Sequence, residues 1–354
     1  MVIVHVAEWF YRPFNGVKVV VPEHIKVQQN IEDVGFINLC DVKIEGVKNQ
    51  ITLPKKYEIG NLPEPFNRAD LFIFHEVYKL KFLKLAKKLR KAKIPYIIIP
   101  HGCLSQQAQN SKKLKKTIGN LLFFNKFIKK AKAIQCLSQK EMENTNFNNK
   151  KFVGSNGVSL PQETKKSFSS DAIKAVYIGR LDLYHKGLDL LLDAIKNCSD
   201  KLRLVNFTLR ICGPDQNDWR QMLKDRIDEL QISDMVLLKD ALFDDAKKEE
   251  LLNSDIFIQT SRFEGMPLGI MEAMSYGLPC LVTDGTTLGD LINENDAGWC
   301  AKTNSEDIGC KLEQMIEEKE QFLHKSQNAK KVAEKYFAWE KVACETIKSY
   351  QDLI

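Results

Sequence analysis

The chain has 354 residues, of which 44% are hydrophobic and 28% charged, and a net charge of +6. This length predicts two domains of about 150 to 200 residues, and the composition is normal for a globular enzyme. No apolar run approaches the roughly 20 residues that span a bilayer, and a strand-like run stands at the start in place of a secretory leader.

Charge is divided unevenly along the chain. Residues 1–170 carry 29 Lys and Arg against 13 Asp and Glu, whereas the remainder carries 23 against 33. This asymmetry predicts two domains with different partners, the first of which faces something anionic. The nine cysteines show no metal-ligand or paired spacing, so we expect reduced thiols in a cytoplasmic protein.

Short apolar runs alternate with helical patterns throughout the chain. We expect strands at 2–7, 36–39, 71–74, 96–99, 133–137, 175–178, 207–212, 235–238, 256–258 and 280–282. We expect helices at 17–32, 79–93, about 111–131, 188–195, 268–276 and about 337–350. Strands joined by helical crossovers build parallel sheets that are covered on both faces.

The stretch 261–274, Ser-Arg-Phe-Glu-Gly-Met-Pro-Leu-Gly-Ile-Met-Glu-Ala-Met, carries the strongest functional signal. It follows a predicted strand, and its loop holds Glu264 while its helix holds Glu272. Free backbone amides at Leu268 and Gly269 would attract a phosphate to the helix N-terminus. The two carboxylates suit hydroxyl groups on either side of that phosphate, because an ionised carboxylate only accepts hydrogen bonds. A nucleotide sugar has this pattern of groups.

Glu264 and Glu272, within Glu-Gly-Met-Pro-Leu-Gly-Ile-Met-Glu-Ala-Met, resemble the E-x7-E signature of retaining glycosyltransferases of family 4. The resemblance implies an α/β, GT-B fold: two Rossmann-like domains whose parallel sheets face a central cleft. The expected N-terminal, acceptor-binding domain is 1–158, and the C-terminal, nucleotide-sugar-binding domain is 171–337. A linker at 159–170 joins them, and a crossover helix at about 338–354 returns to the first domain.

The resemblance also assigns roles to individual residues. Arg180 and Lys186, in Gly-Arg-Leu…Lys-Gly, match the family's diphosphate-binding pair and would stabilise the departing diphosphate. Glu264 would bind a sugar hydroxyl and Glu272 the ribose hydroxyls. His101, after the strand 96–99, would reach the donor sugar.

The remaining contacts that we expect with substrate come mainly from backbone and small residues. They are Gly16, Gly179, Gly213, Leu238, Ala241, Met266, Leu268 and Gly269. Gly213, Leu238 and Ala241 are the candidates for the nucleobase, and Gly16 for the loop after the first strand, where an ordinary turn is an equal alternative. His75 also follows a strand and is a weaker candidate than His101.

Two basic, amphipathic segments, 79–93 and 111–130, predict contact with an anionic membrane. In the alternative interpretation Leu114, Ile118, Leu121, Leu122 and Ile128 face the core and the lysines are only solvated. Nucleic acid is disfavoured because no recognised binding motif accompanies the charge. We expect a cytoplasmic protein, peripheral on the inner face of the cell membrane.

The donor and acceptor follow from the same resemblance. We expect a nucleotide-sugar donor, with a UDP-sugar favoured over a GDP-sugar, and a saccharide acceptor such as a lipid-linked polysaccharide precursor. No cofactor is expected, and no metal, because two cations replace it and no Asp-x-Asp cluster is positioned for one. The alternatives are a nucleotide-sugar epimerase and a non-catalytic subunit that binds sugar nucleotide or glycan. A glycoside hydrolase would have no use for Arg180 and Lys186.

Overall fold

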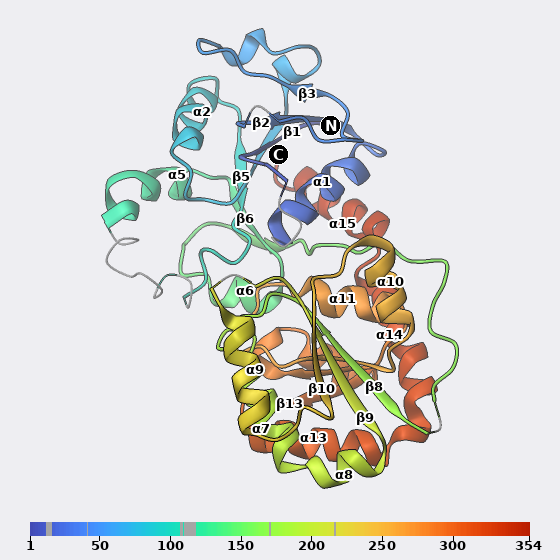
Figure 1. The fold of residues 1–354 in the computed structure, drawn as a ribbon. Helices are drawn as coiled ribbons and strands as arrows, with labels where there is room; N and C mark the ends of the chain where they lie inside the picture. Colours follow the sequence, from blue (N-terminus) through green and yellow to red (C-terminus); the bar gives the residue numbers. More distant parts are fainter. Residues whose placement is uncertain (12–15, 41, 107–108, 110–117, 170, 216) are drawn as a thin grey trace. The chain divides into compact units, whose positions relative to one another are not determined.

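The computed structural model describes residues 1–11, 16–40, 42–106, 109, 118–169, 171–215 and 217–354 (Figure 1). The chain divides into two compact units. The first comprises Met1–Gly157 and Trp339–Ile354, and the second comprises Val158–Ala338. The predicted boundaries at residues 158 and 338 lie beside these divisions, and the predicted linker is grouped with the second unit.

The first unit is built on a seven-stranded sheet with the strand order β3-β2-β1-β4-β5-β6-β7, in which every pairing is parallel. Its strands are β1 (Val2–Ala7), β2 (Asp33–Asn38), β3 (Gln50–Ile51), β4 (Leu71–His75), β5 (Tyr96–Ile99), β6 (Ala133–Cys136) and β7 (Lys151–Val153). The inner strands are almost wholly apolar, as expected for a parallel sheet that is buried on both faces.

Helices cover both faces of this first sheet. They are α1 (Gly16–Gln28), α2 (Leu80–Lys91), the π-helical turn η3 (Asn120–Phe124), α5 (Asn125–Lys129), α6 (Gln139–Glu143) and α15 (Trp339–Gln351), with short 3-10 turns η1 (Ile59–Asn61) and η2 (Phe66–Arg68). Helices α2 and α5 pack on the face that carries Val4, Phe72 and Ile98. Helices α1 and α15 contact each other on the opposite face.

The second unit contains a six-stranded sheet with the order β10-β9-β8-β11-β12-β13, again with parallel pairings throughout. Its strands are β8 (Ile173–Ile178), β9 (Phe207–Cys212), β10 (Val236–Lys239), β11 (Ile256–Gln259), β12 (Cys280–Thr283) and β13 (Gly298–Ala301).

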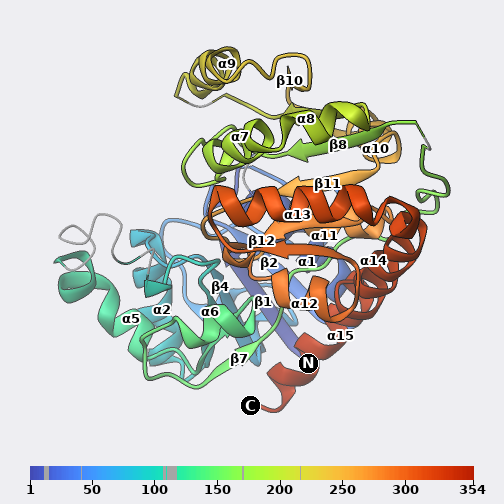
Figure 2. The same ribbon diagram turned by 90° about the horizontal axis from the view of Figure 1, so that it is seen from below.

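Side chains that alternate along these strands pack into two separate hydrophobic cores, one on each face of the sheet. Helices α7 (Leu188–Asn197), α8 (Ser199–Leu204), α9 (Trp219–Glu229) and α13 (Ser305–Glu317) pack on one face of the sheet. Helices α10 (Asp244–Leu252), α11 (Leu268–Ser275), α12 (Gly289–Glu294) and α14 (Phe322–Tyr336) pack on the other face. Figure 2 shows α7 and α8 lying along β8 and α14 beside α11. The 3-10 turns η4 (Asp284–Thr286) and η5 (Lys319–Gln321) complete the unit.

Several expected helix limits are wrong. Helix α1 ends at Gln28 instead of residue 32, because the chain then turns toward β2, with the Ile31 and Glu32 amides both bonded to the Gln28 carbonyl. The final helix begins at Trp339, within one residue of the start expected for the crossover helix at about 338–354, and Phe337 and Ala338 separate it from α14. Of the expected helix at about 111–131, residues 111–117 lie outside the described residues, and the rest ends at Lys129.

Candidate active site

The carboxyl ends of the strands in the second sheet bring most of the predicted substrate-binding residues to one edge. Ile178 pairs with Cys212, which also pairs with Lys239. Gly179 and Gly213 are therefore neighbours, and the Gly179 amide donates to the Cys212 carbonyl over 3.0 Å. Ligands of open parallel sheets bind at this edge.

Two glycines at this edge are required for close approach of backbone. A Cβ atom on Gly213 would lie 1.8 Å from the Gly179 carbonyl oxygen. Gly187 precedes α7 with a φ of 63°, and a Cβ atom there would lie 2.0 Å from the Thr260 carbonyl oxygen. The segments that carry Arg180, Lys186 and Glu264 can meet only because both side chains are absent.

Arg180 is fixed through its backbone but keeps an unpaired charge. The Tyr177 hydroxyl donates to the Arg180 carbonyl over 2.7 Å, and the guanidinium donates to Nδ1 of His185 over 3.3 Å. Burial lowers the pKa of His185, so this imidazole is a neutral acceptor. Among the described residues no carboxylate forms an ion pair with Arg180. Its charge remains available to an anionic ligand.

Glu264 is held through one of its two carboxylate oxygens. Its Oε1 accepts from Lys186 Nζ at 2.5 Å, from Ser261 Oγ at 2.8 Å and from Gln259 Nε2 at 3.1 Å. No contact to Oε2 is recorded within the described part of the chain. Burial alone would raise the pKa of Glu264, but Lys186, His185 and Ser261 together outweigh this effect and the pKa is lowered. Glu264 is therefore an ionised acceptor with one free oxygen.

The loop that carries Glu264 is tied to neighbouring elements. The Glu264 amide donates to the Gly285 carbonyl over 3.0 Å. Arg262 forms a bidentate pair with Asp189 of α7, each contact 2.7 Å long, and stacks on Tyr184. Bidentate pairs of this kind fix side-chain orientation as well as charge.

Helix α11 begins at Leu268, as the sequence predicts. The amides of Ile270 and Met271 bond to the Pro267 carbonyl, whereas Leu268 and Gly269 occupy the first two helical positions, whose amides have no partner within the helix. Met266 packs against the adjacent core. Glu272 lies one turn further on and is ion-paired with Lys247 of α10, a partner that the sequence analysis did not identify.

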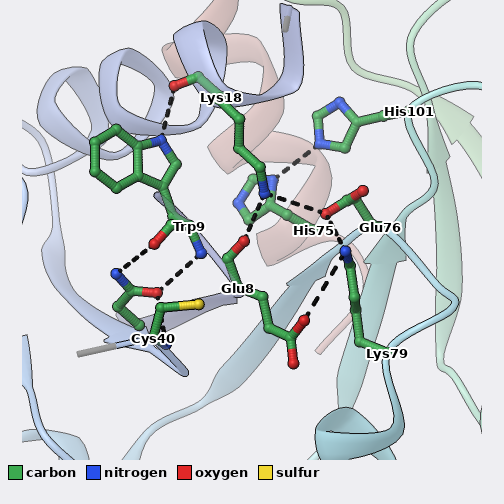
Figure 3. Close-up of polar contacts among 9 residues, drawn as sticks. Glu8, Trp9, Lys18, Cys40, His75, Glu76, Lys79 and His101 are labelled. Carbon is green, nitrogen blue, oxygen red and sulfur yellow. Dashed lines mark hydrogen bonds and ion pairs between the residues drawn. The ribbon is translucent and has the colours of Figure 1, made fainter. Parts of the chain in front are cut away.

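In the first unit, His101 follows β5 with a φ of 49° and is half-buried. Figure 3 shows its ring bonded to His75 and lying close to Lys18. Lys18 Nζ donates to the Glu8 carbonyl over 2.5 Å and lies 3.5 Å from Glu76. No short sequence motif marks this Lys18 cluster, which also includes Lys79 at 3.4 Å from Glu76.

Gly16 is the exposed first residue of α1. The four residues before it lie outside the described part of the chain, so its predicted contact with substrate stays a prediction. Leu238 lies in β10, whose last residue pairs with Cys212, and Ala241 follows that strand.

Residues 161–332 match the family model of glycosyl transferases group 1. The second unit is a group 1 glycosyl transferase domain. The whole chain also resembles Anabaena HepE, solved in complex with UDP and glucose, with a TM-score of 0.74 over 99% of this chain and 100% of that one at 16% identity. Sucrose-phosphate synthase from Thermosynechococcus elongatus gives a TM-score of 0.75 at 14% identity over 100% and 99% of the two chains. These matches confirm the predicted α/β, GT-B fold.

The curated relatives align with only part of this chain and with only part of their own length. A putative colanic acid biosynthesis glycosyltransferase WcaL of Salmonella typhimurium is 26% identical over 42% of this chain and 37% of its own length. The MMP alpha-(1->4)-mannosyltransferase of Mycolicibacterium hassiacum is 25% identical over 36% of this chain and 32% of its own length. The aligned regions thus span only about a third of either relative.

Three further properties bear on the predicted membrane contact, metal independence and free thiols. In the described ranges, none of the helices has the length and apolar character needed to cross a bilayer. The same ranges hold no cluster of three or more His, Cys, Asp or Glu arranged to bind a metal ion. All nine cysteines are free thiols, and burial raises the pKa of Cys212 to about 12.

Proposed function

We propose that this chain transfers a hexose from a nucleoside-diphosphate sugar to an acceptor hydroxyl with retention of the anomeric configuration and without a metal ion. The observation that carries the proposal is the Arg180 guanidinium, which has no carboxylate partner among the described residues and lies at the carboxyl edge of the second sheet, beside the Lys186–Glu264 pair. Cleavage of the donor leaves negative charge on the diphosphate. A cation that is already in place stabilises the charge as it develops.

Different groups at this edge suit different parts of the donor. The diphosphate is assigned to Arg180, Lys186 and the free amides at the start of α11. The free Oε2 of Glu264 accepts a sugar hydroxyl, and Glu272 accepts the ribose hydroxyls. His101 lies in the first unit and not at this edge, and for it we propose a separate role, in which its ring binds a sugar hydroxyl. The departing phosphate takes the acceptor's proton, so no enzymic nucleophile is required.

A UDP-sugar is the donor that we favour over a GDP-sugar, and UDP is the nucleotide in the solved complex of HepE. For the acceptor we propose a lipid-linked precursor of a cell-surface polysaccharide. The naming of WcaL for colanic acid biosynthesis supports this class of acceptor.

A surface of the first unit suits such an acceptor. Ile118, Leu121, Leu122 and Phe123 have exposed fractions of 49%, 74%, 63% and 52%, and Lys126 and Lys129 follow in α5. Because Ile118, Leu121 and Leu122 are exposed, the alternative in which they face the core is wrong for these three residues. Ile128 is buried, as that alternative expects. We propose that this apolar and basic surface binds an anionic membrane. The protein would then be cytoplasmic and peripheral on the membrane's inner face.

Binding and turnover of donors test the function. Thermal-shift measurements with UDP-, GDP- and ADP-sugars should show one clear ligand, whose hydrolysis or transfer persists in EDTA. Loss of that turnover in Arg180→Ala and Glu264→Ala, with ligand-free folding intact, is the expected result. Interconversion of free donor without acceptor would indicate an epimerase, and binding without turnover with any acceptor would indicate a non-catalytic subunit. Either outcome overturns the proposal.

Vesicle co-sedimentation tests the membrane surface. Vesicles with anionic lipid should retain the protein at low salt and release it at high salt, since surface attraction is screened by ions. Leu121→Glu with Leu122→Glu should abolish retention. Leu204→Glu, at another apolar side chain that is 85% exposed, serves as the control and should not change it. Absence of binding by the unmodified protein would remove the membrane from the proposal.

A further inference from the structure

Buried polar side chains form a continuous chain across the face of the first sheet that α1 and α15 cover. His5 of β1 pairs with Ile73, two residues before His75 in β4, and His75 pairs with Ile99, two residues before His101. Residues two apart in a strand share a face, so this register places His5 and His75 on the same side of the sheet. His101 lies beyond the end of β5, and its ring stacks on that of His75. His5 and His75 are fully buried.

Hydrogen bonds link the histidines end to end. His101 Nε2 lies 3.1 Å from His75 Nδ1, an interaction drawn in Figure 3. His75 Nε2 lies 2.8 Å from His5 Nδ1, and His5 Nε2 lies 2.9 Å from Gln28 Oε1 in α1. Each internal nitrogen has one partner, so each neutral ring donates at one side and accepts at the other.

The far end of the chain fixes its direction. Gln135 donates to the Gly154 carbonyl over 2.9 Å, and a carbonyl can only accept. Its Oε1 therefore accepts from the Tyr350 hydroxyl at 2.7 Å. The Tyr350 hydroxyl donates its single proton to Gln135, so its oxygen can only accept from Gln28, and the Gln28 side chain presents its amide nitrogen to it. That nitrogen also lies 2.8 Å from His24 Nε2.

With Gln28 oriented in this way, its Oε1 accepts from His5, His5 accepts from His75, and His75 accepts from His101. We infer that this chain fixes His101 as the Nε2–H tautomer, so that His101 presents Nδ1 as a hydrogen-bond acceptor and selects a hydroxyl donor in its ligand. His75, His5 and Gln28 are positioning residues, since they act only through His101. The identity of the ligand rests on the proposed function, whereas the tautomer does not.

The surroundings keep the histidines neutral. Burial lowers the pKa of His5 to about 4 and, together with nearby Lys18, that of His101 to about 3. Burial likewise lowers the pKa of His75, and its histidine neighbours and Lys18 add to this shift. The Glu76 carboxylate pairs with Lys18 and Lys79, and the Glu8 carboxylate pairs with Lys79. Among the described residues no carboxylate bonds to His101.

This arrangement gives His101 a defined selectivity. Its Nδ1 has no recorded partner among the described residues. A neutral imidazole nitrogen with a lone pair accepts from O–H but is repelled by a phosphate or carboxylate oxygen, which offers no proton. His101 therefore binds a group that donates a hydrogen bond, such as a hydroxyl, and not a phosphate oxygen.

Histidine-selective ¹⁵N NMR of the full, ligand-free chain tests the tautomer. Protonated and unprotonated ring nitrogens have widely separated ¹⁵N shifts, so each ring can be classified. At pH 7 we expect His5, His75 and His101 as Nε2–H and His24 as Nδ1–H. Nδ1–H at His101, an equal mixture of tautomers, or an imidazolium there would overturn the inference, whether or not the protein binds a nucleotide sugar.

Matched variants test the coupling. His75→Phe should let His101 exchange between tautomers, and His5→Gln offers a second break if that variant does not fold. His24→Phe is the control, because Tyr350 still orients Gln28 without it.

For the donor that binds, one deoxyfluoro analogue, which cannot donate at the replaced hydroxyl, should bind about tenfold more weakly to the unmodified protein. His75→Phe should bind this analogue and the natural donor with similar affinity. Equal penalties in both proteins for every analogue would contradict the assigned role of Nδ1.

Discussion

Lys186 Nζ lies 2.5 Å from Oε1 of Glu264, and the same oxygen also accepts from Ser261 and Gln259. Three donors on one oxygen determine the orientation of the carboxylate and leave Oε2 as an acceptor. The ion pair also compensates two charges whose side chains are only 13% and 12% exposed. Glu264 is thus both a partner of Lys186 and a group that can bind a hydroxyl.

Replacement of Glu264 by Gln separates these two properties. The amide oxygen can take the place of Oε1, but the amide nitrogen then stands at Oε2 and cannot accept a hydroxyl proton. We expect kcat/KM for transfer to fall about 10- to 100-fold, the value of a hydrogen bond to a charged group. Glu250→Gln, which breaks the ion pair with Arg210 in the same unit, is the control and should retain activity.

Arg180→Ala should reduce kcat far more than it reduces stability. Loss of a preformed charge at a departing diphosphate costs about 10²- to 10³-fold in rate, whereas no described carboxylate is left unpaired. Steady-state kinetics and urea unfolding measure the two effects. Arg203→Ala removes an exposed arginine bonded to Asp234 and should change neither property greatly. Equal rates for Arg180→Ala and the unmodified protein would exclude the assigned role.

Gly213→Ala should damage the site through its backbone. The new methyl group would overlap the Gly179 carbonyl and displace the segment that leads into Arg180. We expect a loss of about 1–3 kcal/mol in the free energy of unfolding, as for other overpacked sites, together with weaker donor binding. Gly60→Ala is the matched control, since a Cβ atom there has no neighbour within 4 Å. Similar stability of the two variants would contradict the close approach.

The buried histidines predict a loss of stability in mild acid. They stay neutral in the folded chain, with pKa values lowered to about 4 for His5 and about 3 for His101, but bind protons near pH 6.5 when the chain unfolds. Above pH 6.5 they add no pH dependence. Below it each lowers the free energy of unfolding by about 1.4 kcal/mol per pH unit, until the folded pKa is reached.

Urea unfolding between pH 7 and pH 5 measures this slope. His5→Asn should reduce the slope by about one proton, because one fewer group then binds a proton only in the unfolded chain. A free energy of unfolding that stays constant over this range would show that the histidines are protonated in the folded state.

Local sequence patterns indicate the positions of the second unit's candidate residues better than those of the first unit's. Arg180, Lys186, Glu264 and the start of α11 lie within short motifs whose spacing places them after parallel strands. The histidine chain depends instead on the register of β1, β4 and β5 and on helices distant in sequence, which no local pattern specifies. A histidine within a wholly apolar strand, as in 2–7, is the one signal that could have indicated it.

Other differences have similar causes. Helices α8, α13 and α14 were not predicted, and they pack on the second sheet through residues whose burial depends on tertiary contacts. Lys247 was missed as the partner of Glu272 because the two lie on different helices. The alternation of strands and helices, by contrast, is visible in the sequence and is confirmed by both sheets.

A crystal structure of this chain with an intact UDP-sugar, or with UDP alone, tests the central claim most directly. The account predicts that oxygens of the diphosphate lie within hydrogen-bonding distance of the Arg180 guanidinium and of the free amides of α11, with a hydroxyl of the donor on Oε2 of Glu264. A diphosphate bound elsewhere, with Arg180 and Lys186 out of reach, would contradict it.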